Sequence, residues 1–186
     1  MTIDKRRDEL LALLAANSYF ERELTLASGR RANYYIDAKR TLYLPQGALL
    51  AGDLMLDLVL PSGVRQLGGL ATGALPITDA IICAAGRRAA DLRGLFVRKE
   101  TKAHGLQQLI EGAFQPTDPT AVIDDTITTG GSSLSAAQAL RQAGATVTHA
   151  FALVDRGEGA TAAFAAAGLD YSFLFTADEI RRRARA

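Results

Sequence analysis

The sequence predicts an α/β fold built on a mainly parallel sheet with helices on both faces. Two observations lead to this prediction. From about residue 68 onward, short apolar segments typical of strands alternate with segments typical of helices. Polar or glycine-rich residues also follow four of the predicted strands, after Ala71, Val97, Ile123 and Val154. Because ligands of such sheets bind beyond the carboxyl ends of the strands, we expect the site at these four loops.

The amino-terminal part is predicted to hold a helix, a hairpin and a second helix. Residues 3–17 carry leucines on one helical face. Residues 24–26 and 34–36 are short apolar or aromatic segments on either side of a Ser-Gly-Arg turn, which is typical of two paired strands. Residues 45–60 form the second predicted helix, with Pro45 in its first turn.

The remaining elements follow as alternating strands and helices. Strands are predicted at 68–71, 94–97, 120–123, 147–154 and 171–175, and helices at 76–85, 133–143 and through the alanines to Gly168. Thr176 and Glu179 have the spacing of a capping box, so a last helix is expected after them.

Composition restricts the class of protein. The chain has 186 residues with 21 Lys+Arg and 20 Asp+Glu, a net charge of +1, and 48% hydrophobic residues, which predicts one globular domain over residues 1–186. A near-neutral total argues against a general nucleic-acid surface. The one cysteine, Cys83, lies among apolar neighbours and is predicted to be a buried small side chain. With no apolar stretch long enough for a membrane, we expect a cytoplasmic protein.

The most informative segment is Ala-Val-Ile-Asp-Asp-Thr-Ile-Thr-Thr-Gly-Gly-Ser-Ser at 121–133. A hydrophobic strand runs into two carboxylates, then hydroxyls, two glycines and a helix. Glycines let the backbone approach a ligand closely, and successive N–H groups at a helix start bind phosphate. Two carboxylates beside a phosphate suit the hydroxyls of an attached sugar, or magnesium held through water. The bland alternative is an ordinary strand–turn–helix junction capped by Ser132 or Ser133.

This segment resembles the phosphoribosyl pyrophosphate (PRPP) signature of type I phosphoribosyltransferases. The resemblance implies a PRPP site with Mg²⁺, held mainly through PRPP and water near the two carboxylates. It assigns Asp124 and Asp125 to the ribose hydroxyls and the rest of the segment to the 5-phosphate cradle. The PRPP-binding residues it implies here are Asp124, Asp125, Thr126, Ile127, Thr128, Thr129, Gly130, Gly131 and Ser132.

A second segment, Val-Arg-Lys-Glu-Thr-Lys-Ala-His-Gly at 97–105, gathers three cations and a histidine behind a strand. Taken alone, such a charge run is usually a solvated loop. Facing a polyphosphate site, its cations can neutralise a departing pyrophosphate. The segment closely resembles the mobile catalytic loop of orotate phosphoribosyltransferases, which closes over the partner's site in a homodimer. The resemblance places Arg98, Lys99, Lys102 and His104 on PRPP and makes Lys102, Arg98 and His104 the catalytic residues.

Two further segments resemble the same family. Residues 24–37 resemble its amino-terminal motif, which puts Tyr34 and Tyr35 beside orotate, although relatives can carry a lysine at the position of Ala27. Arg156, after the 147–154 strand, is implied to bind the orotate carboxylate, with Thr128 adding a hydrogen bond. Residues 69–76 resemble the pyrophosphate loop, whose binding positions are Thr72 and Gly73; relatives can have lysine in place of Gly73.

Together the motifs imply a type I phosphoribosyltransferase fold with a small amino-terminal hood. Residues 1–45 and the carboxyl-terminal end would form that base-binding hood. The implied reaction transfers ribose 5-phosphate from PRPP to orotate, giving orotidine 5′-phosphate and pyrophosphate in pyrimidine (UMP) biosynthesis. The expected partners are these small molecules and a second subunit, with no nucleic acid and no membrane. Two alternatives stay open, namely a phosphoribosyltransferase for a purine or another base and a PRPP-sensing regulator of the same fold.

Overall fold

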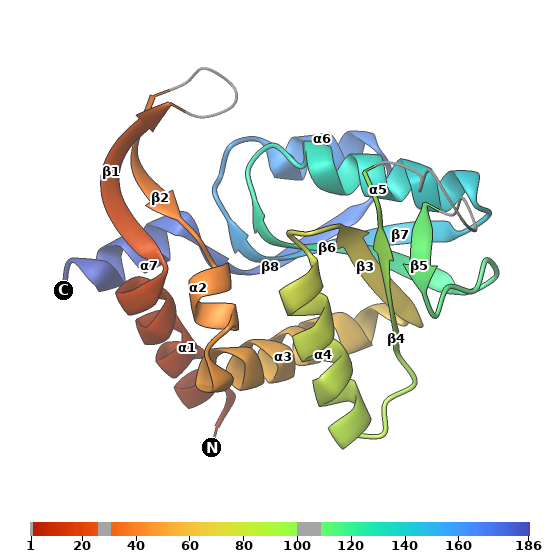
Figure 1. Cartoon of the computed structure of the whole chain (residues 1–186), viewed down its shortest axis with the longest axis horizontal. Helices are drawn as coiled ribbons and strands as arrows, with labels where there is room; N and C mark the ends of the chain where they lie inside the picture. Colours follow the sequence, from red (N-terminus) through yellow and green to blue (C-terminus); the bar gives the residue numbers. More distant parts are fainter. Residues whose placement is uncertain (1, 26–30, 100–108) are drawn as a thin grey trace.

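A computed structural model describes residues 2–25, 31–99 and 109–186 (Figure 1). Its helices are α1 (Ile3–Asn17), α2 (Lys39–Leu42), α3 (Pro45–Val59), α4 (Leu75–Arg87), α5 (Gly131–Gln142), α6 (Ala160–Ala166) and α7 (Ala177–Ala184), with a 3₁₀ turn, η1, at Leu60–Ser62. Its strands are β1 (Tyr19–Thr25), β2 (Arg31–Ile36), β3 (Gln66–Leu70), β4 (Arg93–Val97), β5 (Ile110–Gly112), β6 (Pro119–Ile127), β7 (Thr146–Asp155) and β8 (Asp170–Thr176).

The central sheet of the described chain has six strands in the order β5-β4-β3-β6-β7-β8. All neighbouring pairs are parallel except β4 and β5, which are antiparallel. The order places β3 and β6 side by side at the centre, so the loops after these two strands leave the same edge of the sheet. The predicted α/β class and mainly parallel sheet are therefore confirmed.

Helices cover both faces of the sheet (Figure 1), and each face has its own apolar core. On one face, α3 and α4 pack side chains such as Met55 and Ile81 against the sheet, and Leu10 of α1 belongs to the same core. On the other, α5 and α6 contribute Leu140 and Phe164. Because the central strands are covered on both faces, they read as continuous apolar runs rather than alternating patterns.

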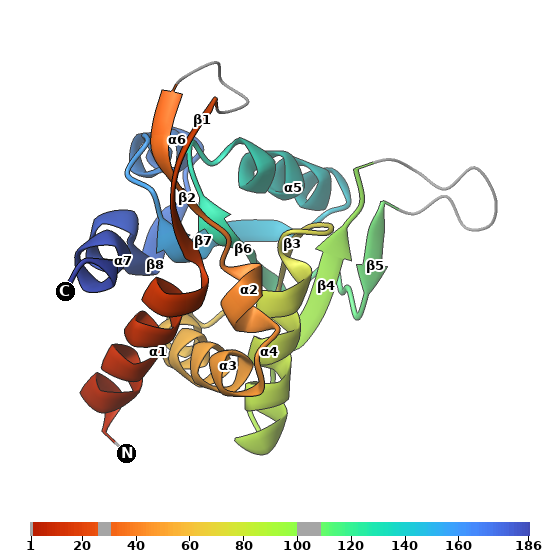
Figure 2. The same cartoon turned by 60° about the vertical axis from the view of Figure 1, so that its left-hand side comes forward.

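The hairpin of β1 and β2 stands apart from the main sheet, beside α1 and α7 (Figure 2). α7 contacts both α1 and β1, and Arg7 of α1 donates a 2.7 Å hydrogen bond to Glu179 of α7. The predicted capping box is present, since Thr176 accepts from the Glu179 N–H and Glu179 accepts from the Thr176 N–H. The two ends of the described chain thus form one layer that carries the hairpin.

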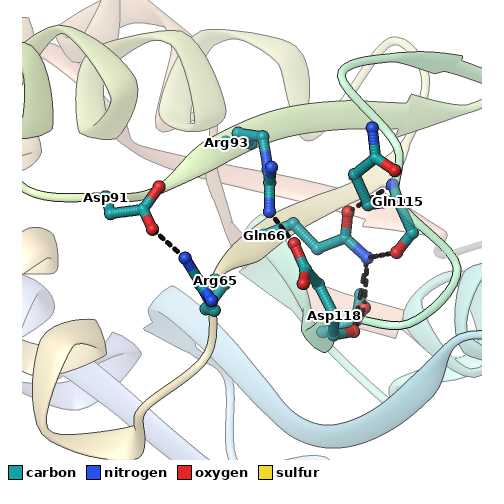
Figure 3. A network of polar contacts seen from close by, with 7 residues as sticks. Arg65, Gln66, Asp91, Arg93, Gln115 and Asp118 are labelled. Atoms are coloured by element: carbon teal, nitrogen blue, oxygen red, sulfur yellow. Dashed lines mark hydrogen bonds and ion pairs between the residues drawn. The ribbon is translucent and has the colours of Figure 1, made fainter.

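At the amino ends of the parallel strands, away from the loops that follow β3 and β6, a buried glutamine connects β3 to β6 (Figure 3). Gln66 donates to the Gln115 carbonyl at 2.8 Å and to the Thr120 hydroxyl at 2.7 Å, and its oxygen accepts from the Gln115 N–H. Arg93 forms an ion pair with Asp118 beside it. A fully buried amide with satisfied donors and acceptor fixes these strand ends, and it lies away from the predicted site.

Three features of the fold differ from the sequence predictions. Cys83 is exposed, so the prediction of a buried thiol is wrong. The sheet side of α4 is set by Ile77, Ile81 and Ala84, and the helical spacing turns Cys83 away from it. The short helix α2 and the edge strand β5 were not predicted, because neither is long enough to show a hydrophobic period. In the described chain, no helix is long and apolar enough to cross a membrane.

Candidate active site

The loop between β6 and α5 encloses a cavity of about 200 Å³. Its lining residues are Asp124, Thr126, Ile127, Thr128, Thr129, Gly130, Gly131, Ser132 and Ser133. The hydroxyls of Thr126 and Ser133 are buried there and have no hydrogen-bond partner among the described residues. Unpaired buried hydroxyls are costly unless a ligand completes them, so this cavity is suited to a polar ligand.

Backbone geometry explains the glycines of this loop. Gly130 caps the amino end of α5 with φ +84°, in the left-handed region that favours glycine. A Cβ added there would lie 3.0 Å from the Phe164 ring. No side chain of the described residues caps α5, so neither Ser132 nor Ser133 serves as the cap of an ordinary junction. The first N–H groups of α5 therefore face the cavity as an anion site requires.

Of the two carboxylates of the motif on β6, Asp125 is buried and Asp124 is half-buried. Asp125 is 5% exposed, and its N–H donates to Asp124 Oδ1 at 3.0 Å. Burial, and then the charge of Asp125, raise the pKa of Asp124 from 3.8 to about 7. Burial also raises the pKa of Asp125, against the opposing effect of the Lys39 ammonium. Such strongly perturbed carboxylates in a cavity are characteristic of functional sites.

The loop after β3 meets this carboxylate pair. A Cβ added to Gly73 would lie 3.1 Å from Asp124 Oδ1, so the backbone of that loop passes directly over the carboxylate. Thr72 is exposed on the same loop, and the peptide bond that precedes it is cis. The structure thus brings Thr72 and Gly73, two positions predicted from the sequence, to the end of β6 that leads into the β6–α5 cavity.

A second cavity, of about 520 Å³, joins the loop after β3 to the end of β4. It is lined by Ala71, Thr72, Leu75, Phe96, Arg98 and Lys99. Arg98 forms a 3.1 Å ion pair with Glu111 of β5, while Lys99 is exposed. Two of the four diphosphate contacts predicted in the 97–105 segment thus line the same cavity as Thr72. The other two, Lys102 and His104, lie outside the described residues.

Arg156 joins the sheet edge to the hairpin. Its side chain is 5% exposed, its guanidinium carbon lies 5.2 Å from the centre of the Tyr34 ring, and one nitrogen is 3.0 Å from Glu158. The Nε atom is buried and has no hydrogen-bond partner among the described residues. A buried guanidinium that pairs with Glu158 through one nitrogen and keeps an Nε–H donor unpaired within the described chain can bind a second anion.

The two tyrosines of the hairpin are placed differently. Tyr34 stacks on Tyr19, with ring centres 5.9 Å apart, and contacts Arg156. Tyr35 is 41% exposed and pairs in register with Phe20 of β1. Neighbouring residues on a strand point to opposite faces, so the structure brings Tyr34 to Arg156 and leaves the Tyr35 side chain on the other face.

Three residues at the site were not predicted from the sequence. Lys39 of α2 lies 3.1 Å from Asp125, Glu158 holds Arg156, and Arg181 of α7 lies 5.9 Å from the centre of the Tyr34 ring. Glu158 stands two residues from Arg156 and Lys39 four residues from Tyr35, and this nearness to a predicted site residue was the only local signal for them. Arg181 gave no local signal, because its approach to the hairpin depends on tertiary packing.

Comparisons with known proteins agree with this arrangement. No family model matches the chain. An orotate phosphoribosyltransferase of Rhodopirellula baltica is 43% identical over 173 residues, which cover 90% of each chain. The crystal structure of the Mycobacterium tuberculosis orotate phosphoribosyltransferase with Fe(III) dicitrate is 38% identical, covers 94% of this chain and 98% of that one, and has a TM-score of 0.82.

A second crystal structure of the M. tuberculosis enzyme contains PRPP. It is 34% identical to this chain, covers 95% of it and 99% of its own chain, and superimposes with a TM-score of 0.79. These relatives match over nearly their whole length, well above the identity at which a likeness shows only the fold. The chain belongs to the orotate phosphoribosyltransferase family.

Proposed function

We propose that the chain transfers ribose 5-phosphate from PRPP to N1 of orotate, giving orotidine 5′-phosphate and pyrophosphate. The observation that carries this proposal is the buried Arg156 side chain, whose Nε has no partner among the described residues. It lies beside Tyr34 at the carboxyl end of β7, the strand next to β6. A planar guanidinium fork suits the planar carboxylate of orotate. The M. tuberculosis relative solved with PRPP supports the choice of donor.

PRPP would lie along the loops at the carboxyl ends of β3, β4 and β6. Its 5-phosphate would occupy the cavity of the β6–α5 loop and accept from the N–H groups at the start of α5. Its ribose hydroxyls would donate to Asp124 and Asp125. Its diphosphate would lie against Thr72, Gly73, Arg98 and Lys99, with Lys102 and His104 approaching from the segment outside the described residues.

The reaction breaks the bond between C1 of the ribose and the diphosphate oxygen and forms a bond from C1 to N1 of orotate. The proton that N1 loses passes to pyrophosphate or to solvent. The electron pair of the broken bond leaves with pyrophosphate, and the sugar becomes oxocarbenium-like in between. The residues of this chain position both substrates, neutralise the departing charge and exclude water. Lys102 is the leading candidate for catalytic assistance, and His104 can donate a hydrogen bond or proton to pyrophosphate.

Orotate would bind between the hairpin and the end of β7. Its carboxylate would meet Arg156, the Tyr34 ring would supply a flat wall, and the backbone of Tyr34 and Tyr35 would supply donors. Thr128 lines the neighbouring cavity and would add a hydrogen bond. In this arrangement, residues 1–45 and the carboxyl-terminal end act as the base-binding hood of a single domain over residues 1–186.

The donor set of the site fits a magnesium ion that is held mainly by PRPP. Among the described residues, no cluster of three or more His, Cys, Asp or Glu side chains could hold a metal by itself. Asp124 and Asp125 offer hard carboxylate oxygens at the cavity, and Mg²⁺ usually keeps water and substrate phosphate as most of its ligands. When bound, the ion would offset the charge of the diphosphate.

We also propose that the active enzyme is a homodimer in which the segment 97–105 of one subunit closes over the site of its partner. The resemblance to the family supports this assembly. A cytoplasmic location likewise stays a prediction from the sequence.

Acceptor selection tests the proposed function. The protein with PRPP and Mg²⁺ is offered orotate, uracil or adenine, and nucleotide formation is followed by chromatography. We expect orotidine 5′-phosphate from orotate and no product from uracil or adenine, because neither carries a carboxylate for Arg156. Product from adenine alone would assign the chain to purine chemistry. PRPP binding without any product, joined to RNA binding that falls steeply with salt, would assign it to the regulators.

A further inference from the structure

Lys39 connects the hairpin layer to the carboxylate pair of β6. It is the first residue of α2, and its ammonium lies 3.1 Å from Asp125 Oδ2 and 3.5 Å from Asp37 Oδ1. The side chain of Lys39 is 41% exposed, whereas that of Asp125 is 6% exposed. The cation therefore reaches from the rim of the site to a carboxylate that solvent hardly touches.

Electrostatics makes this contact significant for a polyanionic substrate. Asp124 and Asp125 are adjacent, Asp125 is buried and Asp124 is half-buried, and the proposed donor adds a 5-phosphate and a diphosphate next to them. A lone buried carboxylate is strongly disfavoured, and its neighbour makes its ionisation harder still. The Lys39 ammonium offsets one of the two negative charges, and its hydrogen bond to Oδ2 favours one rotamer of Asp125.

The backbone that carries Lys39 is held in place by buried hydrogen bonds. Thr41, two residues along α2, shares a 2.7 Å hydrogen bond with Ser18 at the end of α1, and both side chains are fully buried. The Thr41 hydroxyl also donates to the Leu13 carbonyl at 3.2 Å, and the Asp37 N–H donates to the Ser18 carbonyl at 2.9 Å. α2 is thus a fixed support, although it has only four residues.

We propose that Lys39 is a positioning residue for the ribose site: it holds the Asp125 carboxylate in the orientation that receives the ribose hydroxyls of PRPP. This inference rests on the proposed function for the identity of the donor. It assigns Lys39 no direct contact with substrate and makes its effect depend on Asp125. Loss of the ammonium would let the Asp125 carboxylate turn, so PRPP would bind less tightly while the orotate pocket at Arg156 would keep its shape.

The test compares Lys39→Met, Lys39→Gln and Lys39→Arg with a matched control, Arg40→Met. Arg40 is the next residue on α2, carries the same charge and stacks on Phe20 at 4.8 Å. The PRPP dissociation constant with Mg²⁺ is measured by calorimetry, and KM for each substrate by initial rates. We expect about 10- to 100-fold weaker PRPP binding in the Met and Gln variants, the range for a lost charge-assisted hydrogen bond. Orotate KM should stay within about twofold.

Lys39→Arg should recover most of the PRPP affinity, because it keeps the charge, and Arg40→Met should leave PRPP affinity unchanged. Thermal unfolding identifies any variant that has lost its fold. Unchanged PRPP affinity in both Lys39→Met and Lys39→Gln, or an equal loss in Arg40→Met, would overturn the proposal.

A double-mutant cycle tests the dependence on Asp125. If Lys39 acts through Asp125, Lys39→Met combined with Asp125→Asn should bind PRPP as Asp125→Asn does alone, within about threefold. Losses that multiply would show that Lys39 acts by another route and would contradict the proposal. Because calorimetry needs no turnover, a wild type that binds PRPP but leaves orotate unchanged would defeat the proposed function while the cycle still decides the role of Lys39.

Discussion

At the residue scale, the site depends on buried charge that the rest of the fold has to accommodate. Asp124 shows this most clearly, because its pKa stands near 7 in the folded chain against an ordinary 3.8, through burial and the adjacent Asp125. The folded protein therefore holds a proton at pH values where the unfolded chain has released it. The stabilising contribution of Asp124 is complete below about pH 4 and is lost as the pH rises through about 7.

Asp124→Asn should remove this loss. Asparagine cannot ionise, and its oxygen can still accept from the Asp125 N–H. In ligand-free protein we expect the variant to exceed the wild type in free energy of unfolding by roughly 2–4 kcal/mol at pH 8 and to match it near pH 4. Urea unfolding between pH 4 and 8 measures the difference. A difference that did not change with pH would contradict the burial argument.

At the scale of elements, the junction of β6 and α5 is the part of the structure that the sequence describes best. An apolar strand, two carboxylates, hydroxyls and glycines follow one another within thirteen residues, so local chemistry alone indicates the cavity. The junction requires glycine at position 130, because φ there is +84° and an added Cβ would lie 3.0 Å from the Phe164 ring.

Gly130→Ala should therefore destabilise both the fold and the phosphate site. The left-handed backbone costs alanine about 1–2 kcal/mol, and the contact with Phe164 adds to this. Gly168→Ala is the matched control, because Gly168 has φ +68° and its added Cβ would meet no atom within 4 Å. We expect urea unfolding to show a larger loss for Gly130→Ala than for Gly168→Ala, and only the former to raise KM for PRPP. Equal losses of stability would argue against the Phe164 contact.

Other elements could not be predicted, for physical reasons that differ between them. α2 has four residues and no apolar period, and the contact that matters, from Lys39 to Asp125, spans 86 positions of sequence. β5 has three residues and is defined by pairing with β4 rather than by its own composition. The apolar sequence neighbours of Cys83 predict a buried thiol. Burial on a helix depends instead on which face a residue occupies, and Ile81 and Ala84 occupy the buried face of α4 while Cys83 does not.

At the scale of the whole molecule, the net charge of +1 is an average over separated charges. The buried Asp125 and the half-buried Asp124 lie at the end of β6, and the cations Arg98 and Lys99 line the cavity next to it. Tyr34 of the hairpin contacts Arg156 at a third place around the site, the carboxyl end of β7. The near-neutral total is thus compatible with a small polyanion as substrate.

A subunit-mixing experiment tests the proposed sharing of the loop between subunits. Lys102→Ala should lower turnover far more than orotate binding, and Arg156→Ala should weaken orotate binding. If the loop of one subunit serves the partner's site, each mixed dimer contains one site with neither change. Random pairing of the two variants by co-expression should then recover about a quarter of wild-type activity.

Two outcomes of this experiment would contradict parts of the account. Activity of the mixture no higher than the mean of the separate variants would show that each site is completed within one subunit. Undiminished turnover in purified Lys102→Ala would remove that residue from the catalytic set.

The central claim is transfer of the phosphoribosyl group to orotate, and the most direct measurement is the loss of orotate in the presence of the purified wild-type protein and PRPP, with and without Mg²⁺. We predict orotate consumption matched by equal amounts of orotidine 5′-phosphate and pyrophosphate when Mg²⁺ is present, and little or none without it. Orotate that stays unchanged with PRPP and Mg²⁺ both in excess would contradict the claim.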